Sequence, residues 1–325
     1  MGILMKRLLV AVLATLAGVA AAAAQSYPSR PITIIVPFPA GGPTDTLARI
    51  VSEYMKGPIG QPVIVENVAG AGASIGIGRA VAAAPDGYTL SLGNWTSHVG
   101  AGAIYPVNWH ILNDLAPVAK LPVSTLIIVG KNDLPAKDIR ELIAWMKANP
   151  GKASIANVGA GSGAHICSVY FNDKVGVSGT FVPYKGGAPV MQDLVGNQID
   201  MFCAEASQTL AHVRAGKMKA FTVLSEQRWA PLPDVPTMKE ITSADISLPF
   251  WHGLWAPKNT PKDVIGKLNA AVANVFADPA VQKRITDLGM VIPSRAEQSP
   301  EALAAYHKAE VEKWWPVIKA AVKKD

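Results

Sequence analysis

Residues 32–49 read ITIIVPFPAGGPTDTLAR and combine the signals of a strand, a glycine turn and the start of a helix. The β-branched run Ile32–Val36 lies between prolines and predicts a short buried strand. From Pro43 onward apolar residues recur at helical spacing, and proline at a first helical position costs no hydrogen bond. Gly41 and Gly42 leave the amides of that first turn uncovered, and such amides, together with the helix dipole, attract anionic oxygens. A tight connection without a ligand is the simpler explanation of one such turn, so a functional interpretation needs a second turn facing it.

The second turn reads GAGSGAH over residues 159–165 and again follows a predicted strand. Its first two glycines and Ala164 fit a relaxed dinucleotide-binding motif. That motif also needs an acidic residue at the end of the next strand, and residues 177–184 contain none. Ser162 is not in a G-x-S-x-G nucleophile elbow, because both residues two positions away are alanines. We therefore expect no cofactor here, but a small anion held by Ser162 and the surrounding amides.

The N-terminus indicates an exported protein. Lys6 and Arg7 precede the apolar run Leu8–Val19, and the small-residue run Ala20–Ala24 follows it. This order is typical of a secretory signal peptide, here residues 1–24, cleaved after about Ala24. An uncleaved anchor is the alternative, but the apolar run is shorter than the roughly 20 residues that a membrane span needs.

The composition favours a large protein of two domains whose partner is not a nucleic acid. The chain has 325 residues, of which 50% are hydrophobic, and this is ample for more than one core. Its net charge of +6 is dispersed, with no dense basic cluster before Lys323–Lys324. The histidines lie far apart, and no acidic cluster has the spacing of a calcium loop, so we expect no metal site.

Strand and helix patterns alternate from residue 27 to about 125, and a central block is inserted between the flanking segments. The predicted fold is α/β with two lobes, each a mixed sheet flanked by helices. Lobe 1 is expected to comprise residues 25–125 and 249–325, and lobe 2 residues 126–248. Polar residues such as 94–98 follow strand ends, where open α/β sheets bind their ligands.

Cys167 and Cys203 are the only cysteines of the chain. An oxidising compartment permits a disulfide between them. Their apolar surroundings favour two buried free thiols, which is the expectation, although pairing stays open.

Several motifs occur together and in order: PFPAGGPTD over 37–45, GSGAH over 161–165, PYKGGAP over 183–189 and DVPT over 234–237. In this respect the chain, from about residue 27 to its C-terminus, resembles the Bug family, the periplasmic substrate-binding subunits of tripartite tricarboxylate transporters. The resemblance implies a type II periplasmic-binding-protein fold that closes on a small organic acid. It also implies a monomeric, non-enzymatic protein of the periplasm that delivers its ligand to integral membrane transporter subunits.

The resemblance implies that two turns hold one ligand carboxylate, largely through amides and bridging waters. The residues expected in the site on this basis are Phe38, Ala40, Gly41, Gly42, Gly161, Ser162, Gly163, Ala164 and His165. Strand ends add Trp95, Thr96, Ser97, Tyr184, Glu205 and Ala206 as candidates. Trp95 and Glu205 depart from the family pattern. Trp95 offers a flat stacking surface for a ring, and Glu205, if it faces the cleft as an anion, would repel a second carboxylate and prefer an amine or a hydroxyl donor. The expected ligand is a mono- or dicarboxylate, including aromatic or amino-bearing acids.

Individual residues allow more than one interpretation. Asp45 in the first helical turn is most simply a partner of the helix dipole. Thr96 and Ser97 either cap a following helix or donate to the ligand, and His165 is more typical of a satisfied, half-buried histidine than of a ligand contact. Tyr184 beside its glycine pair favours a functional role, whereas Lys185 favours solvent.

Two other classes of function remain open. An exported hydrolase or transferase would use Ser162 with His165 or Glu205, although no clear serine–histidine–aspartate order is present. A ligand-sensing subunit would present the same closed surface to a signalling receptor instead of a transporter.

Overall fold

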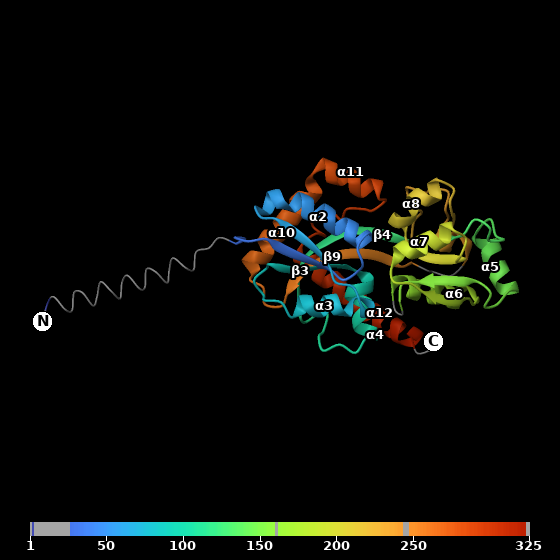
Figure 1. The fold of residues 1–325 in the computed structure, drawn as a ribbon, viewed down its shortest axis with the longest axis horizontal. Coiled ribbons are helices and arrows are strands. Elements are labelled where there is room, and N and C mark those ends of the chain that lie inside the picture. The colour runs from blue at the N-terminus through green and yellow to red at the C-terminus, as the bar shows by residue number, and fades with distance from the viewer. Residues whose placement is uncertain (1, 3–26, 160–161, 243–246, 323–325) are drawn as a thin grey trace.

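The computed structural model describes residue 2 and residues 27–159, 162–242 and 247–322, so Gly161 and all of the predicted signal peptide except residue 2 lie outside the described residues. The elements, which Figure 1 shows, are β1 (Ile32–Val36), α2 (Pro43–Ile59), β2 (Val63–Asn67), the short 3₁₀ turn η1 (Ala71–Ala73), α3 (Ser74–Val81), β3 (Thr89–Asn94), the π-helical turn η2 (Thr96–Gly100), α4 (Ala101–Ile104), β4 (Leu115–Gly130), α5 (Ile139–Ala148), β5 (Ser154–Asn157), α6 (Gly163–Val175), β6 (Thr180–Pro183), α7 (Gly187–Val195), β7 (Met201–Glu205), α8 (Ala206–Arg214), β8 (Lys219–Val223), α9 (Met238–Ile241), β9 (Pro249–Pro257), α10 (Lys262–Ala277), α11 (Pro279–Asp287) and α12 (Pro300–Val322). The expected α/β architecture is confirmed.

The strands form two mixed sheets joined by one long strand. The first sheet has the order β2-β1-β3-β9-β4, and the second continues as β4-β7-β5-β6 with β8 also paired to β4. β4 is the shared strand: it pairs with β9 as far as Thr125 and with β7 from Leu126 onward. The sequence predicted only Leu121–Val129 of it. Pro117 and Pro122 interrupt the pattern because proline cannot donate to a ladder, and the register with β9 shifts at both places.

Each sheet lies between two layers of helices (Figure 1). Helices α2, α10 and α11 cover one face of the first sheet, and α3, α4 and α12 cover the other. On the second sheet α7 and α8 lie on one face, and α5 and α6 on the opposite one. The apolar stripe that predicted α2 is buried, with Leu47, Val51 and Met55 all 0% exposed in the core between α2, α10 and the sheet.

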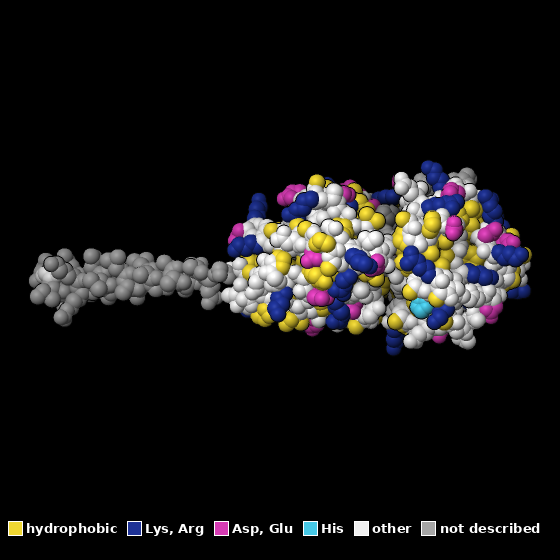
Figure 2. All heavy atoms as spheres, turned by 90° about the horizontal axis from the view of Figure 1, so that it is seen from above, with side chains coloured by type: hydrophobic (Ala, Val, Ile, Leu, Met, Phe, Trp, Pro, Cys, Tyr) yellow, Lys and Arg dark blue, Asp and Glu magenta, His cyan; other side chains and the backbone are white. Residues whose placement is uncertain are grey.

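This arrangement turns the carboxyl ends of β1, β3, β5 and β7 toward the line where the two bodies meet. β1, β2 and β3 run parallel, as do β6, β5 and β7, and helices or helical turns begin just beyond these strands. Figure 2 shows the surface hollowed along that line, with basic and acidic side chains interspersed over both bodies on the face drawn. Among the described residues, no helix is both long and apolar enough to cross a membrane.

Candidate functional site

A cavity of about 530 Å³ lies between the two bodies and is lined by residues that follow the ends of β1, β2, β3, β5, β6 and β7. Ligands of open α/β sheets bind at this edge. The residues expected from the sequence that line the cavity are Phe38, Ala40, Gly42, Thr96, Ser162, Gly163, Ala164 and Glu205. The two glycine turns therefore share one hollow, which is the condition on which the functional interpretation depended.

The first turn is held in shape by Asp45. This side chain is 3% exposed and accepts hydrogen bonds from the Gly41 amide, Arg49 Nε and Asn67 Nδ2, each at 2.9 Å. Asn67 Nδ2 also donates to the Phe38 carbonyl oxygen at 3.1 Å. Burial alone would raise the pKa of Asp45, but these hydrogen bonds and the charge of Arg49 outweigh it and hold the pKa below its usual value.

The start of α2 keeps amide donors for the cavity. Gly42 is the capping residue and has no side chain to accept from them, and Pro43 carries no amide hydrogen. The Thr46 amide is bonded to the Gly42 carbonyl oxygen at 2.9 Å, so the amides of Thr44 and Asp45 are the ones left at the helix start. Gly41 was expected in the ligand site but does not line this cavity. Its amide is already bonded to Asp45, and Gly41 lines a neighbouring groove instead.

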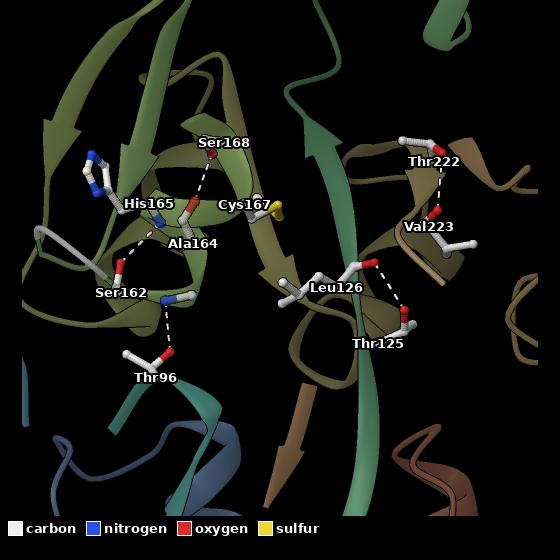
Figure 3. The surroundings of a disulfide bond; sticks show 12 residues. Thr96, Thr125, Leu126, Ser162, Ala164, His165, Cys167, Ser168, Thr222 and Val223 are labelled. Atoms are coloured by element: carbon white, nitrogen blue, oxygen red, sulfur yellow. Dashed lines mark hydrogen bonds between the residues drawn. A yellow bond between two sulfur atoms is a disulfide. The ribbon is translucent and has the colours of Figure 1, made fainter. Parts of the chain in front are cut away.

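The second turn ends at Ser162, the cap of α6. Its Oγ accepts from the His165 amide at 3.2 Å, so its hydroxyl hydrogen can still be donated. The Gly163 amide donates to Thr96 Oγ1 at 2.8 Å, and Figure 3 shows Thr96 reaching up from η2 to the start of α6. A Cβ at Gly163 would lie 2.8 Å from both Thr96 Oγ1 and the Phe250 ring, so glycine is required for this approach. The hydrogen bond joins the two bodies across the cavity.

Glu205 forms the polar end of the cavity at the last residue of β7. The side chain is buried, at 5% exposed, and Ser207 Oγ donates to its Oε1 at 3.2 Å. His252 Nε2 lies 3.9 Å from the same oxygen. Burial raises the pKa of Glu205 to about 8, so at neutral pH the carboxyl group keeps its proton. The sequence left the charge of Glu205 open, and its burial favours the neutral acid over the anion.

His252 behind Glu205 is also uncharged. Its Nδ1 lies 3.0 Å from the Pro122 carbonyl oxygen, which can only accept, so Nδ1 carries the hydrogen and Nε2 the lone pair. Burial lowers the pKa of His252 to about 4, although the bond to Pro122 acts in the opposite direction. Thr44 Oγ1 lies 3.4 Å from Nε2 and accepts from Asn94 Nδ2 at 2.9 Å. A connected set of polar groups thus links α2, β3 and β9 behind this end of the cavity.

Trp95 and Ser97 do not line the cavity. Trp95 is 4% exposed and packs edge-on against Trp314, with ring centroids 5.5 Å apart, so it offers no stacking surface to a ligand. Ser97 is 0% exposed and its hydroxyl donates to the Asn94 carbonyl oxygen at 3.0 Å, so it is occupied at the junction of β3 and η2. The physical reason is the helical turn η2: its successive residues point in different directions, and of these three only Thr96 lines the cavity.

Three more candidates lie outside the cavity wall. The Tyr184 hydroxyl donates to Asp193 Oδ2 at 2.7 Å, which occupies it within the β6–α7 connection. The His165 ring packs against Phe181, and Figure 3 shows it on the opposite side of α6 from Cys167. Ala206 is 0% exposed in the core under α8. Sequence reasoning recognised these motifs but could not assign the direction of each side chain.

The structure adds cavity residues beyond the candidates named for the site. The polar ones are Thr44, Asn94, Lys185 and Gln208, and Phe250 from β9 contributes an apolar wall. Lys185 and the glycines after it were recognisable as a third strand–glycine–helix turn, since Gly187 begins α7. Phe250 carried no such signal, because its place depends on how β9 crosses the sheet.

Cys167 and Cys203 form a disulfide with a Cα–Cα distance of 6.2 Å, so the expectation of two free thiols is wrong. The bond fastens α6, whose start carries the second turn, to β7, which carries Glu205. Cys203 itself lines the cavity. In the part of the chain that the structure describes, no group of three or more histidine, cysteine or acidic residues could hold a metal ion.

Two lobes that meet around a cavity at their strand ends, with helix starts directed into it, define the class of solute-binding proteins. The model of the Tripartite tricarboxylate transporter family receptor (TctC) matches residues 47–322, and the chain belongs to this family.

Known relatives agree with this assignment. The protein BugT of Bordetella pertussis is 34% identical over 306 residues, which are 93% of each chain. The periplasmic binding protein BugD has a similar structure, with a TM-score of 0.86 and 38% identity over 91% of this chain and 98% of that one. MatC from Rhodopseudomonas palustris with bound malate gives a TM-score of 0.85 and 34% identity over 90% of this chain and 100% of that one. The predicted family, two-lobed fold and receptor class are confirmed.

Proposed function

We propose that this protein captures a small organic carboxylate between its lobes and delivers it, in the closed form, to integral membrane subunits of a tripartite tricarboxylate-type transporter. The observation that carries the proposal is the convergence of helix starts from both bodies on one cavity. Amides at a helix start have no acceptor within the helix and lie at the positive end of its dipole, which suits a carboxylate.

The first carboxylate is proposed to bind between the starts of α2 and α6. Its donors are the amides of Thr44, Asp45 and Ala164, the Ser162 hydroxyl, and water molecules that bridge the remaining distances. No arginine is needed, because several neutral donors together replace the water around the anion. The malate bound in MatC supports a ligand of this class.

The lobes are proposed to rotate about β4 and β9. The change of β4 from pairing with β9 to pairing with β7 falls between Thr125 and Leu126. This supports the division of the chain into 25–125 with 249–325 and 126–248. Closure is then a shift between two populated states, which a ligand that contacts both lobes drives. We further propose an exported monomer, without its first 24 or so residues, that catalyses no reaction.

A thermal-shift experiment tests the proposal. Protein that has been unfolded and refolded to remove bound solute is mixed with straight-chain mono- and dicarboxylates of four to eight carbons, with malate, and with the matching neutral amides. A ligand at a hundred times its Kd stabilises the native state by about 2.7 kcal/mol. We expect carboxylates to raise Tm and amides not to do so. If no carboxylate raises Tm, the proposed function is wrong.

Two glycine variants locate the effect. Gly163→Ala places a methyl group against Thr96 and Phe250 and should remove the thermal shift. Gly266→Ala makes the same chemical change on α10, where a Cβ meets nothing within 4 Å, and should keep it. Retention of the full shift by Gly163→Ala would contradict the location of the site.

Uptake and turnover separate the remaining functions. Loss of uptake of the stabilising acid in a strain lacking the gene supports transport, whereas unchanged uptake with loss of a transcriptional response would support a sensor. Hydrolysis of simple esters that Ser162→Ala abolishes would support an enzyme.

A further inference from the structure

Glu205 has a place in the cavity that the binding of one carboxylate does not explain. It lies at the end of β7, while Ser162 and Ala164 line the cavity from the start of α6. The side chain is buried, and its Oε1 lies 3.9 Å from Nε2 of His252, which belongs to β9. Its backbone pairs with β4 at Leu126. A buried acid on a cavity wall is a group that a ligand must meet.

The surroundings of Glu205 supply no positive charge to stabilise an anion. The other charged side chains on the described cavity wall are Asp45 of α2, which Arg49 neutralises, and Lys185, which is exposed ahead of α7. His252 presents a lone pair to Glu205, not a hydrogen, as its bond to Pro122 requires. The hydroxyl groups of Ser207 and Ser124 act against burial and lower the pKa of Glu205, but both are neutral. A carboxylate anion here would be poorly compensated, whereas a neutral acid is well placed.

A neutral acid changes what the cavity selects. An ionised Glu205 would repel a second carboxylate and attract an amine, but the O–H of the neutral form is a donor. An O–H···O⁻ bond between an acid and a carboxylate is among the shorter and stronger hydrogen bonds in proteins. The approach of an anion also raises the pKa of the acid further, which keeps the proton in place.

We propose that Glu205 determines specificity by donating a hydrogen bond from its carboxyl O–H to a second carboxylate of the ligand, so that binding of a diacid depends on a protonated Glu205. This inference rests on the proposed function, since the first carboxylate must bind at the helix starts. With a pKa of about 8 in the unliganded protein, the affinity for a diacid falls as pH rises above that value. An amine in the same position would show the opposite dependence.

Isothermal titration calorimetry at pH 7 and pH 9 tests the inference. The probes are the diacids that raise Tm, the monoacids of the same length with a methyl group in place of the second carboxylate, and the corresponding ω-amino acids. If a diacid binds only while Glu205 is protonated, its affinity should fall about tenfold from pH 7 to pH 9. Monoacids should bind more weakly than diacids and should show no such loss.

Matched variants identify the group responsible. Glu205→Gln keeps a neutral donor of the same shape, so it should bind the diacid within about threefold of wild type at pH 7 and lose the tenfold pH dependence. Glu205→Leu removes the donor and should weaken the diacid more than tenfold while leaving the monoacid nearly unchanged. Glu310→Gln is the control, since Glu310 is another buried carboxyl group with a raised pKa but lies outside the cavity.

The outcomes separate this inference from the proposed function. If monoacids and diacids bind equally, or if Glu205→Gln keeps the wild-type pH dependence, the role of Glu205 is wrong while a carboxylate receptor stands. If ω-amino acids bind best, more tightly at pH 9, and lose affinity in Glu205→Gln, Glu205 acts as an anion and the inference is overturned. If no carboxylate binds at either pH, both proposals fail.

Discussion

The hydrogen bond between Thr96 and Gly163 is expected to hold the closed form together, and Thr96→Val tests this. Valine has nearly the same shape as threonine but cannot accept the hydrogen bond that the Gly163 amide donates at 2.8 Å. Both residues are buried between η2 and α6. In the closed form the variant therefore leaves a buried donor without its acceptor, whereas in an opened form water can reach the amide.

The magnitude follows from that asymmetry. A buried donor that loses its partner costs about 1–3 kcal/mol, and here only the closed form bears the cost. Because each 1.4 kcal/mol is a tenfold change, Kd for a stabilising carboxylate should rise by about 5- to 150-fold. Thr96→Ser keeps the hydroxyl group and should bind within about threefold of wild type, which separates loss of the acceptor from loss of the methyl group.

Calorimetric titration gives Kd, and small-angle X-ray scattering gives the change in radius of gyration on binding. Thr96→Val should need more ligand to reach the same compact form. Its urea midpoint without ligand should match that of wild type, because each lobe keeps its own core. Binding of Thr96→Val with wild-type affinity would refute the assignment of this contact to closure.

Three further perturbations probe the parts that hold the site. Replacing both cysteines by alanine should lower the free energy of unfolding by roughly 3–4 kcal/mol, as expected for a loop with a sequence separation of 36, and urea unfolding of the variant against oxidised wild type measures this. Asp45→Asn removes the charge that binds Arg49, so the first turn should be held less firmly and carboxylate binding should weaken by about 3- to 10-fold. Calorimetric titration measures this loss of affinity. Asp263→Asn, in the first turn of α10, is the control. Acid should destabilise the protein, because burial lowers the pKa values of His98, His252 and His307, the last two to about 4. Below pH 6.5 these histidines bind protons in the unfolded chain but stay neutral in the folded one. Their contribution to the free energy of unfolding is therefore complete above pH 6.5 and is lost toward pH 4, by up to about 1.4 kcal/mol per pH unit for each histidine. Denaturant unfolding at pH 7.5 and pH 5.5 measures this loss, and replacement of one of these histidines by glutamine should reduce it.

Much of the scaffold could be predicted from the sequence because its signals are local. β1 was marked by a β-branched run between prolines and α2 by the spacing of its apolar residues, and both occupy the expected ranges closely. The starts of α2 and α6 were recognisable because a glycine turn precedes each of them, and because proline fixes the backbone at the first position of α2. Their arrival at one cavity follows from the rule that parallel strands end on the same edge of a sheet.

The direction of side chains at the cavity could not be predicted in the same way. Trp95, Thr96 and Ser97 are consecutive, and only the rotation of η2 decides that Thr96 lines the cavity. Whether Cys167 meets Cys203 depends on how α6 packs on β7, which no spacing in the sequence encodes. The charge of Glu205 depends on burial by β4 and β9, and these elements lie far from it along the chain.

The two ends of the cavity present donors of different kinds, and this difference has a consequence for closure. The amides at the starts of α2 and α6 are donors at every pH, whereas the donor at the end of β7 is a proton that Glu205 can lose. A diacid is then held at one end under all conditions and at the other only while that proton is present. Thr44 and His252 stand behind Glu205 on the opposite body, so an ionised Glu205 would face a lone pair across the line of closure. A ligand shifts a conformational equilibrium only by its differential affinity for the two states. Loss of this one proton should therefore weaken ligand binding and closure together, while the amide end of the site stays unchanged.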